Sequence, residues 1–185
     1  MNYKRDTPAL WEKVFADIQD SLSANLDWLN NTFGKAERVQ KVIRERRYFE
    51  PAWWKGGNDY TLLSPTDTLG NFAFFTIGEP QVTDFEVWGD TQAKAPFSLI
   101  VWADLRTIAE QGERNVEALK ESILKVLNGQ THTKHGSYTI TRIYERAENV
   151  YEGFTLDETK NQFTMHPYVA LRFMGQVIAH TTCNQ

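Results

Sequence analysis

His132 and His135 are the residues of this sequence whose spacing comes closest to a metal-binding motif. They lie three positions apart in a segment rich in threonine, lysine and glycine, and Lys134 stands between them. A zinc site needs ligands from two converging segments, and the positive charge of the lysine disfavours a cation. The pattern therefore predicts solvent-exposed loop histidines, and we expect no metal site.

Three further candidates for catalysis lie near the end of the chain: His166, His180 and Cys183. A cysteine nucleophile needs a base such as histidine beside it. On an extended chain, Cys183 and His180 point to opposite faces because their separation is odd. A single cysteine also forms no internal disulfide, which indicates a reducing compartment such as the cytoplasm. We expect an inert thiol.

The motifs of several large enzyme classes are missing. The chain contains no Gly-x-Ser-x-Gly, P-loop or Gly-x-Gly-x-x-Gly motif, which removes the usual support for serine hydrolases, nucleotide hydrolases and dinucleotide-binding enzymes. We therefore expect no catalytic residue, no cofactor and no enzyme activity. The alternative that stays open is a small cytoplasmic enzyme with a site built around His132, His135 and Asp104.

A basic segment is more informative. Basic residues outnumber acidic ones by four between positions 35 and 47, although the whole chain has 20 basic and 24 acidic residues. The net charge of −4 opposes long-range attraction of DNA. The basic segment is therefore expected to be a solvated strand or a protein interface for partners with acidic groups, and a neck protein that contacts DNA is the alternative. A single strand would place basic side chains on two faces: Arg38, Arg44 and Arg46 on one, Lys41 and Arg47 on the other.

Aromatic residues follow directly, between Tyr48 and Tyr60. They are too many for one short hairpin to bury, and tyrosine, tryptophan and arginine are enriched at interface hot spots. We assign roughly half of them to the core and the others to contact with another subunit or partner. The predicted interface consists of Arg38, Arg44, Arg46, Arg47, Tyr48, Trp53, Trp54 and Tyr60.

Length and composition limit the architecture that positions these residues. The 185 residues, 41% of them hydrophobic and 13% aromatic, suffice for one domain with a packed core. No linker rich in proline and glycine divides them, so residues 1–185 are expected to form a single domain. No apolar run approaches the roughly 18 residues of a membrane span, so we expect a soluble protein without a membrane partner.

Two amphipathic helices are predicted. The first has Thr7 as its N-cap and Pro8 in its first turn, and it ends near Ala24. The second runs from Val116 to Gly129. We expect a short helical turn at 26–34, a helical turn or loop at 157–160, and strands at 36–48 (where a helix remains possible), 60–63, 71–77, 97–105, 137–146 and 169–179, with 97–105 covered on both faces. This order predicts an α+β fold in which a mostly antiparallel sheet is packed by two amphipathic helices.

Six segments spread over most of the chain resemble a group of uncharacterised prophage-encoded proteins. They are Trp28-Leu-Asn-Asn-Thr-Phe-Gly34, Pro51-Ala-Trp-Trp-Lys-Gly-Gly-Asn-Asp-Tyr60, Leu63-Ser-Pro-Thr-Asp67, Gly70-Asn-Phe-Ala-Phe-Phe75, Leu156-Asp-Glu-Thr-Lys-Asn-Gln-Phe163 and His166-Pro-Tyr-Val-Ala-Leu-Arg-Phe173. The predicted order of elements is also similar to that of the small α+β proteins that terminate or complete the tails of long-tailed phages.

The resemblance implies a structural protein. Tail terminators form a ring, commonly hexameric, that caps the tail tube and joins it to the head-completion proteins. The expected partners are therefore further copies of this chain, tail-tube proteins and head-completion proteins, and not nucleic acid. The expected locations are the host cytoplasm during assembly and then the virion. The resemblance implies no cofactor and no catalytic residue, and another neck or tail component is compatible with it.

Overall fold

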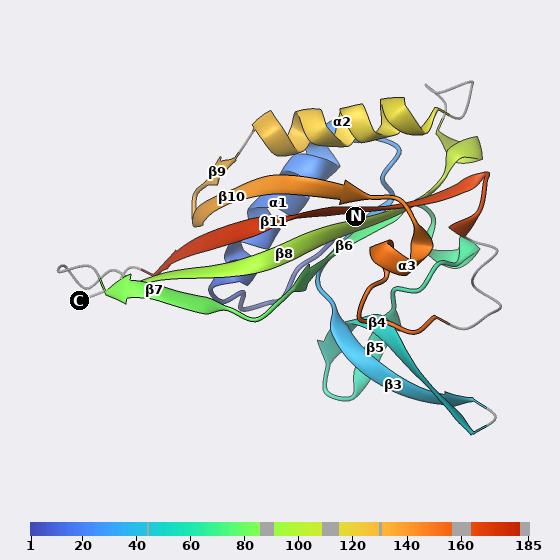
Figure 1. Cartoon of the computed structure of the whole chain (residues 1–185), viewed down its shortest axis with the longest axis horizontal. Helices are drawn as coiled ribbons and strands as arrows, with labels where there is room; N and C mark the ends of the chain where they lie inside the picture. The colour runs from blue at the N-terminus through green and yellow to red at the C-terminus, as the bar shows by residue number, and fades with distance from the viewer. Residues whose placement is uncertain (44, 86–90, 109–114, 130, 157–163, 182–185) are drawn as a thin grey trace.

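A large curved β-sheet forms most of the molecule (Figure 1). The computed structural model describes residues 1–185 apart from 44, 86–90, 109–114, 130, 157–163 and 182–185. Within these residues the sheet has eight strands in the order β1-β2-β6-β8-β11-β10-β9, with β7 also paired to β8. The strands are β1 (Asn2–Tyr3), β2 (Asn31–Lys35), β6 (Phe72–Ile77), β7 (Gln81–Phe85), β8 (Thr91–Asp104), β9 (His132–Thr133), β10 (Gly136–Tyr144) and β11 (Tyr168–Thr181).

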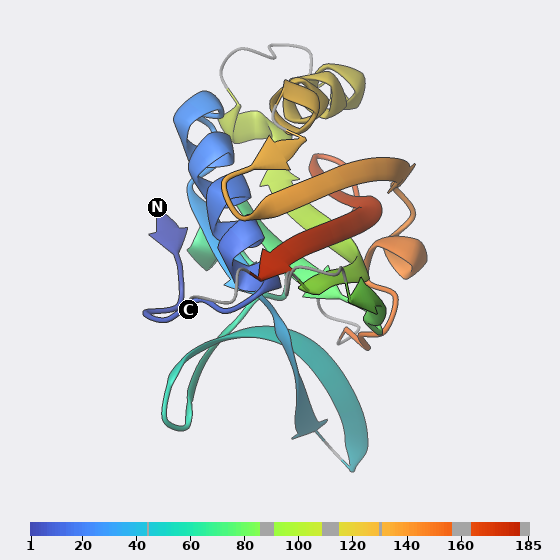
Figure 2. The same ribbon diagram turned by 90° about the vertical axis from the view of Figure 1, so that its left-hand side faces the viewer.

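In the described part of the chain, three α-helices accompany the sheet: α1 (Trp11–Asn25), α2 (Val116–Gly129) and the short α3 (Ala147–Val150). The first two pack against one face of the sheet and against each other (Figure 2). Short 3₁₀ turns occupy Asp67–Leu69 and Leu105–Thr107. The apolar stripe of α1 is buried as its spacing of three and four predicts; it consists of Val14, Phe15, Ile18 and Leu22.

The start of α1 differs from the prediction. The helix begins at Trp11 and not in the turn after Thr7, and Leu10 before it has a φ of 48°. The carboxylate of Glu12 accepts a hydrogen bond from the backbone N–H of Ala9 at 3.2 Å. A carboxylate in the first turn satisfies free N–H groups near a helix start, and its charge suits the helix dipole. Thr7 therefore does not cap the helix, and the N-cap position, Leu10, has no side-chain hydrogen bond.

The predicted fold class, a mostly antiparallel sheet packed by two amphipathic helices, was wrong. The chain is mostly strand: its large sheet curls into a half-barrel and three helices accompany it. The β1-β2 and β2-β6 pairs of this sheet are parallel. A separate three-stranded sheet is formed by β3 (Glu37–Ile43), β4 (Arg46–Gly56) and β5 (Asp59–Leu62).

Two local predictions account for this error. The segment 36–48 was predicted as one strand, but the chain reverses near Glu45, whose φ is 66°, so that β3 and β4 pair with each other. Basic and apolar residues lie on both sides of this turn, and no glycine or asparagine marks it. The helical turn predicted at 26–34 was also wrong, because Asn31–Lys35 forms the strand β2.

The central strand β8 is buried on both faces, as its continuous apolar pattern predicted. Phe97, Leu99 and Val101 face the core under α1 and α2. Ile100 and Trp102 face a second core on the opposite side of the sheet, which also contains residues of β2, β6 and α3. The second core covers only part of this face of the sheet.

Two buried tyrosines allow a paired test of the hydrogen bonding in these cores. The hydroxyl of Tyr138 donates to the backbone oxygen of Leu127 at 2.8 Å and so joins β10 to the end of α2. The hydroxyl of Tyr151 is buried without a hydrogen-bond partner in the described part of the chain. An unsatisfied buried hydroxyl costs about 1–3 kcal/mol, whereas a satisfied one contributes about 1 kcal/mol.

We expect Tyr151→Phe to raise the free energy of unfolding by about 1 kcal/mol and Tyr138→Phe to lower it by a similar amount. Urea denaturation measures both. A loss of stability in Tyr151→Phe as large as that in Tyr138→Phe would show that the Tyr151 hydroxyl has a partner. Burial also raises the pKa of Tyr138 from 10.0 to about 12. The unfolded chain loses this proton near pH 10 and the folded chain near pH 12. The free energy of unfolding should therefore decrease as the pH rises from 10 toward about 12, a decrease that Tyr138→Phe should lack.

Candidate interface on the projecting sheet

The three-stranded sheet of residues 37–62, called the arm below, projects away from the large sheet (Figures 1 and 2). Among the described residues, the arm contacts the rest of the molecule, called the body, near its root, where β2 leads into β3. Ala36, between β2 and β3, donates its backbone N–H to Phe75 of β6 at 2.7 Å, and Thr155 donates to the backbone oxygen of Phe49 at 2.7 Å. The hairpin of β3 and β4 therefore extends beyond these attachments, with both of its faces accessible near the turn.

Strand register divides the basic residues of the arm differently from the prediction. Directly opposed residues of an antiparallel pair share a face. Val42 lies opposite Arg47, and Ile43 lies opposite Arg46. Because Arg46 and Arg47 follow the turn, they belong to β4, and the predicted single-strand division into two faces was wrong. Exposed basic side chains occur on both faces: Arg38 and Arg47 on one, Lys41 and Arg46 on the other.

Exposed apolar side chains accompany these charges. Val42 is 61% exposed, although valine prefers the interior of a sheet. Trp54 and Tyr60 lie opposite each other on β4 and β5 and are 36% and 42% exposed. These three are most of the large hydrophobic side chains that are exposed within the described residues; the others are Met1 and Met165. Exposed apolar groups thus concentrate on the arm.

The other predicted interface aromatics have structural roles. Trp53 is half-buried at the root of the arm, with its ring 5.3 Å from Tyr3 and 6.1 Å from Phe33. Tyr48 is also half-buried. Arg38 stacks its guanidinium over the ring of Phe49 at 3.9 Å. Arg44 lies outside the described residues. The other seven members of the predicted set divide into the half-buried Trp53 and Tyr48 and the exposed Arg38, Arg46, Arg47, Trp54 and Tyr60.

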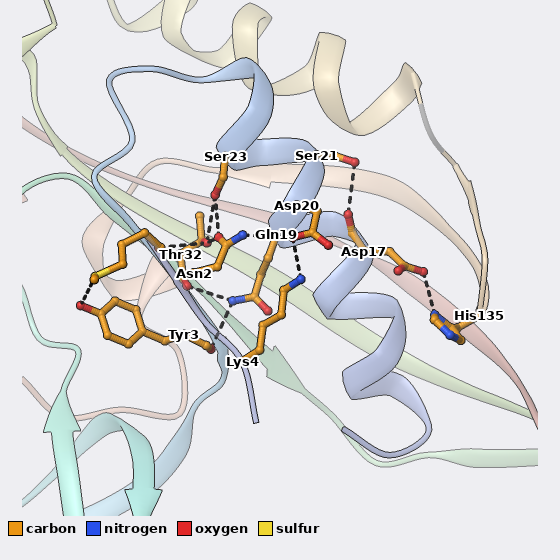
Figure 3. Close-up of polar contacts among 11 residues, drawn as sticks. Asn2, Tyr3, Lys4, Asp17, Gln19, Asp20, Ser21, Ser23, Thr32 and His135 are labelled. Carbon is orange, nitrogen blue, oxygen red and sulfur yellow. Dashed lines mark hydrogen bonds and ion pairs between the residues drawn. The ribbon is translucent and has the colours of Figure 1, made fainter. Parts of the chain in front are cut away.

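The N-terminal segment fastens this root to the body, which the sequence analysis missed. Strand β1 runs parallel to β2, and the buried side chain of Gln19 donates to the backbone oxygens of Thr32 at 2.9 Å and Tyr3 at 3.3 Å (Figure 3). Lys4 forms an ion pair with Asp20 of α1 at 2.6 Å. The sequence contained one signal of this attachment. Gln19 lies four positions after Phe15 and three before Leu22, so the spacing places a polar residue on the buried face of α1.

Arg5 continues the same attachment on the other side of the root. Its guanidinium contacts Glu12 of α1 at 2.8 Å and Glu37 of β3 at 2.9 Å, and it lies 5.5 Å from the ring centre of Trp54. Body and arm are therefore joined by one cation that touches both. Ion pairs of this exposure contribute little stability.

The alternative site of His132, His135 and Asp104 is not assembled. His135 lies beside α1, with its Nδ1 atom 3.0 Å from a carboxylate oxygen of Asp17 (Figure 3). Asp104 lies at the far end of β8, where it binds Arg106 at 2.7 Å. Through β11, the residue after His135 is in register with Ala93 at the opposite end of β8. At about 3.3 Å per strand residue, the two positions are more than about 30 Å apart.

The other histidines and the cysteine considered as candidates do not form a cluster in the described residues either. His132 and His166 are exposed, while the side chains of His180 and Cys183 lie outside the described residues. Within the described ranges, no three side chains of histidine, cysteine, aspartate or glutamate form a group that could hold a metal ion. Across the same ranges, no helix has the length and apolar character needed to cross a membrane.

Comparisons with known proteins add no relative. No model of a known protein family matches the chain, and no curated protein matches it. The functional proposal is therefore based on the arm and the contacts that anchor it.

Proposed function

We propose that this chain is a structural subunit that assembles through its arm into a closed homo-oligomer, and that the assembly is a tail terminator or tail-completion ring of a phage or prophage. One observation carries the first part: a projecting sheet exposes Val42, Trp54 and Tyr60 beside arginine and lysine. Aromatic and arginine side chains are the residues enriched at interface hot spots. The segmental resemblance to prophage-encoded proteins supports the second part.

The distribution of charge supports contact between unlike surfaces of identical subunits. The arm carries six basic and four acidic residues, whereas the other residues of the chain include fourteen basic and twenty acidic. A positive arm on one copy complements the negative body of the next copy. Such a heterologous contact produces a ring when the rotation between neighbours closes. This proposal assigns the chain no catalytic role and no cofactor, and places it in the host cytoplasm and then the virion.

Mass photometry and electron microscopy of the purified chain test the proposal, with Val42→Asp as the variant. The wild type should form closed rings at high concentration. An aspartate buried at this position of the proposed interface should raise the concentration for half-assembly at least about tenfold, because its charge would lose water without a partner. Gln176→Asp, which adds the same charge at an exposed position of β11, is the control and should assemble normally.

Two results would contradict the proposal at different levels. A wild-type chain that stays monomeric, and that also fails to bind a tail-tube protein encoded in a neighbouring reading frame, would remove the tail assignment. Rings that form equally well with Val42→Asp would keep the assembly but exclude the arm as its interface.

A further inference from the structure

A cleft of about 580 Å³ lies where the second core leaves its face of the large sheet uncovered. Its floor includes Ser98 of β8 with Arg172 and Met174 of β11. One wall is the root of the arm, with Lys35, Glu37 and Arg38, and the opposite wall is the segment after α3, with Glu152 and Phe154. Volumes of this size are typical of sites that bind small molecules or short chain segments.

Arg172 is the unusual residue of the floor. It occupies the middle of a central strand and its side chain is only 13% exposed. It donates to the hydroxyl of Ser98 at 2.8 Å, to the backbone oxygen of Asn149 at 3.0 Å and to the carboxylate of Glu152 at 2.8 Å. A buried charge requires a counter-charge. Among the described residues that counter-charge is Glu152, whose own side chain is 72% exposed and so can turn toward solvent.

The arm side of the cleft adds further positive charge. Arg38 is exposed and stacks on Phe49, and no described carboxylate forms an ion pair with it. Glu37 is shared between Lys35 at 3.2 Å and Arg5 at 2.9 Å. Glu37 is thus already engaged by Lys35 and by Arg5, and Arg38 remains available for an external anion.

We propose that the cleft binds an acidic peptide segment of a partner protein, with one carboxylate taking the place of Glu152 on Arg172 and a second contacting Arg38. Arginine binds carboxylates through two parallel hydrogen bonds, which gives both strength and orientation. The two arginines come from separate walls, so a segment with spaced carboxylates satisfies both. Phe154 and Met174 provide apolar surface for a side chain between them. All of the residues of this site belong to one copy.

A titration of the ¹⁵N-labelled chain with the acetylated and amidated peptide Glu-Phe-Asp-Leu tests the site by NMR. Binding should shift the amide signals of Ser98, Gly153 and Met174. Arg172→Gln should weaken binding at least about tenfold, and Arg38→Gln, an exposed change that the fold tolerates, should weaken it severalfold. Glu152→Gln should tighten binding severalfold, because it removes the competing carboxylate. A purely structural role for the Arg172–Glu152 pair would not produce tighter binding.

Arg142→Gln is the matched control. Arg142 stacks on Tyr144 at 5.7 Å, much as Arg172 does at 5.9 Å, but it does not line the cleft. Absence of shifts in the wild type, equal losses for Arg172→Gln and Arg142→Gln, or weaker binding by Glu152→Gln would each overturn the proposal. Succinate and inorganic phosphate form separate arms. Equal shifts by either at the same concentration would show a site for small anions and not for a peptide.

Discussion

Gly175→Ala is expected to destabilise the protein by about 4 kcal/mol or more, beyond the usual cost of overpacking a core. A β-carbon at Gly175 would lie 1.8 Å from the backbone oxygen of Thr139 and 2.8 Å from its carbonyl carbon. Both atoms belong to the backbone of the neighbouring strand β10, so no side-chain rotation relieves the clash. The strands would have to separate.

The close approach has a cause in the strand register. The pairing of β10 with β11 shifts between Ile140 and Arg142, so that β10 carries one extra residue opposite Gly175 and Met174. A bulge of this kind bends its strand and increases the local twist. The curvature of the large sheet thus depends on a position where a side chain cannot fit.

Urea denaturation of Gly175→Ala and Gly129→Ala measures this effect against a matched control. Gly129 is the last residue of α2 and has open space around the position of a β-carbon. Its replacement should change the free energy of unfolding by less than about 0.5 kcal/mol. If Gly175→Ala stays within that range too, β10 and β11 do not approach as closely as the structure indicates.

Tyr3→Ala is expected to loosen the arm and to cost about 2–3 kcal/mol of stability. The ring of Tyr3 stacks on Phe33 with a centroid distance of 4.4 Å and contacts Trp53 edge to face at 5.3 Å. Without it, the root of the arm loses the aromatic packing that joins it to the body. Hydrogen exchange should accelerate in β3, β4 and β5 and remain slow in β8 and β11.

Tyr60→Ala tests the exposed contact surface of the arm, whereas Tyr3→Ala tests the attachment of the arm to the body. Tyr60 is 42% exposed at the arm surface, so its loss should leave exchange and stability nearly unchanged but weaken ring assembly. Tyr3→Ala should weaken both, because a loosely held arm must be ordered on assembly. Unchanged hydrogen exchange in the arm of Tyr3→Ala would contradict the anchoring role.

Elements with a clear local pattern were predictable from sequence. The stripe of Phe15, Ile18 and Leu22 predicted α1, and the continuous apolar run at 97–105 predicted a strand buried on both sides, which is the C-terminal half of β8. Both features follow from the spacing of apolar residues within a single element, which shows which of its faces are buried.

Elements that depend on a distant partner were not predictable in the same way. The turn between β3 and β4 contains Glu45 in a left-handed conformation, which non-glycine residues seldom adopt, so the segment was predicted as one strand. The division of the predicted interface into an anchored Trp53 and an exposed Tyr60 followed from contacts with Tyr3 and Phe33, which lie far earlier in the chain.

The sequence by itself determined the two long helices, the strands β5, β6, β8, β10 and β11, and the concentration of basic and aromatic residues between positions 35 and 60. Only the tertiary structure decided that these residues form an arm outside the large sheet, that Tyr3 packs against its root, and that Arg172 lies in an open cleft. The physical reason is that side-chain periodicity is a local property, whereas strand pairing, register and the burial of a charge depend on residues brought together from distant parts of the chain.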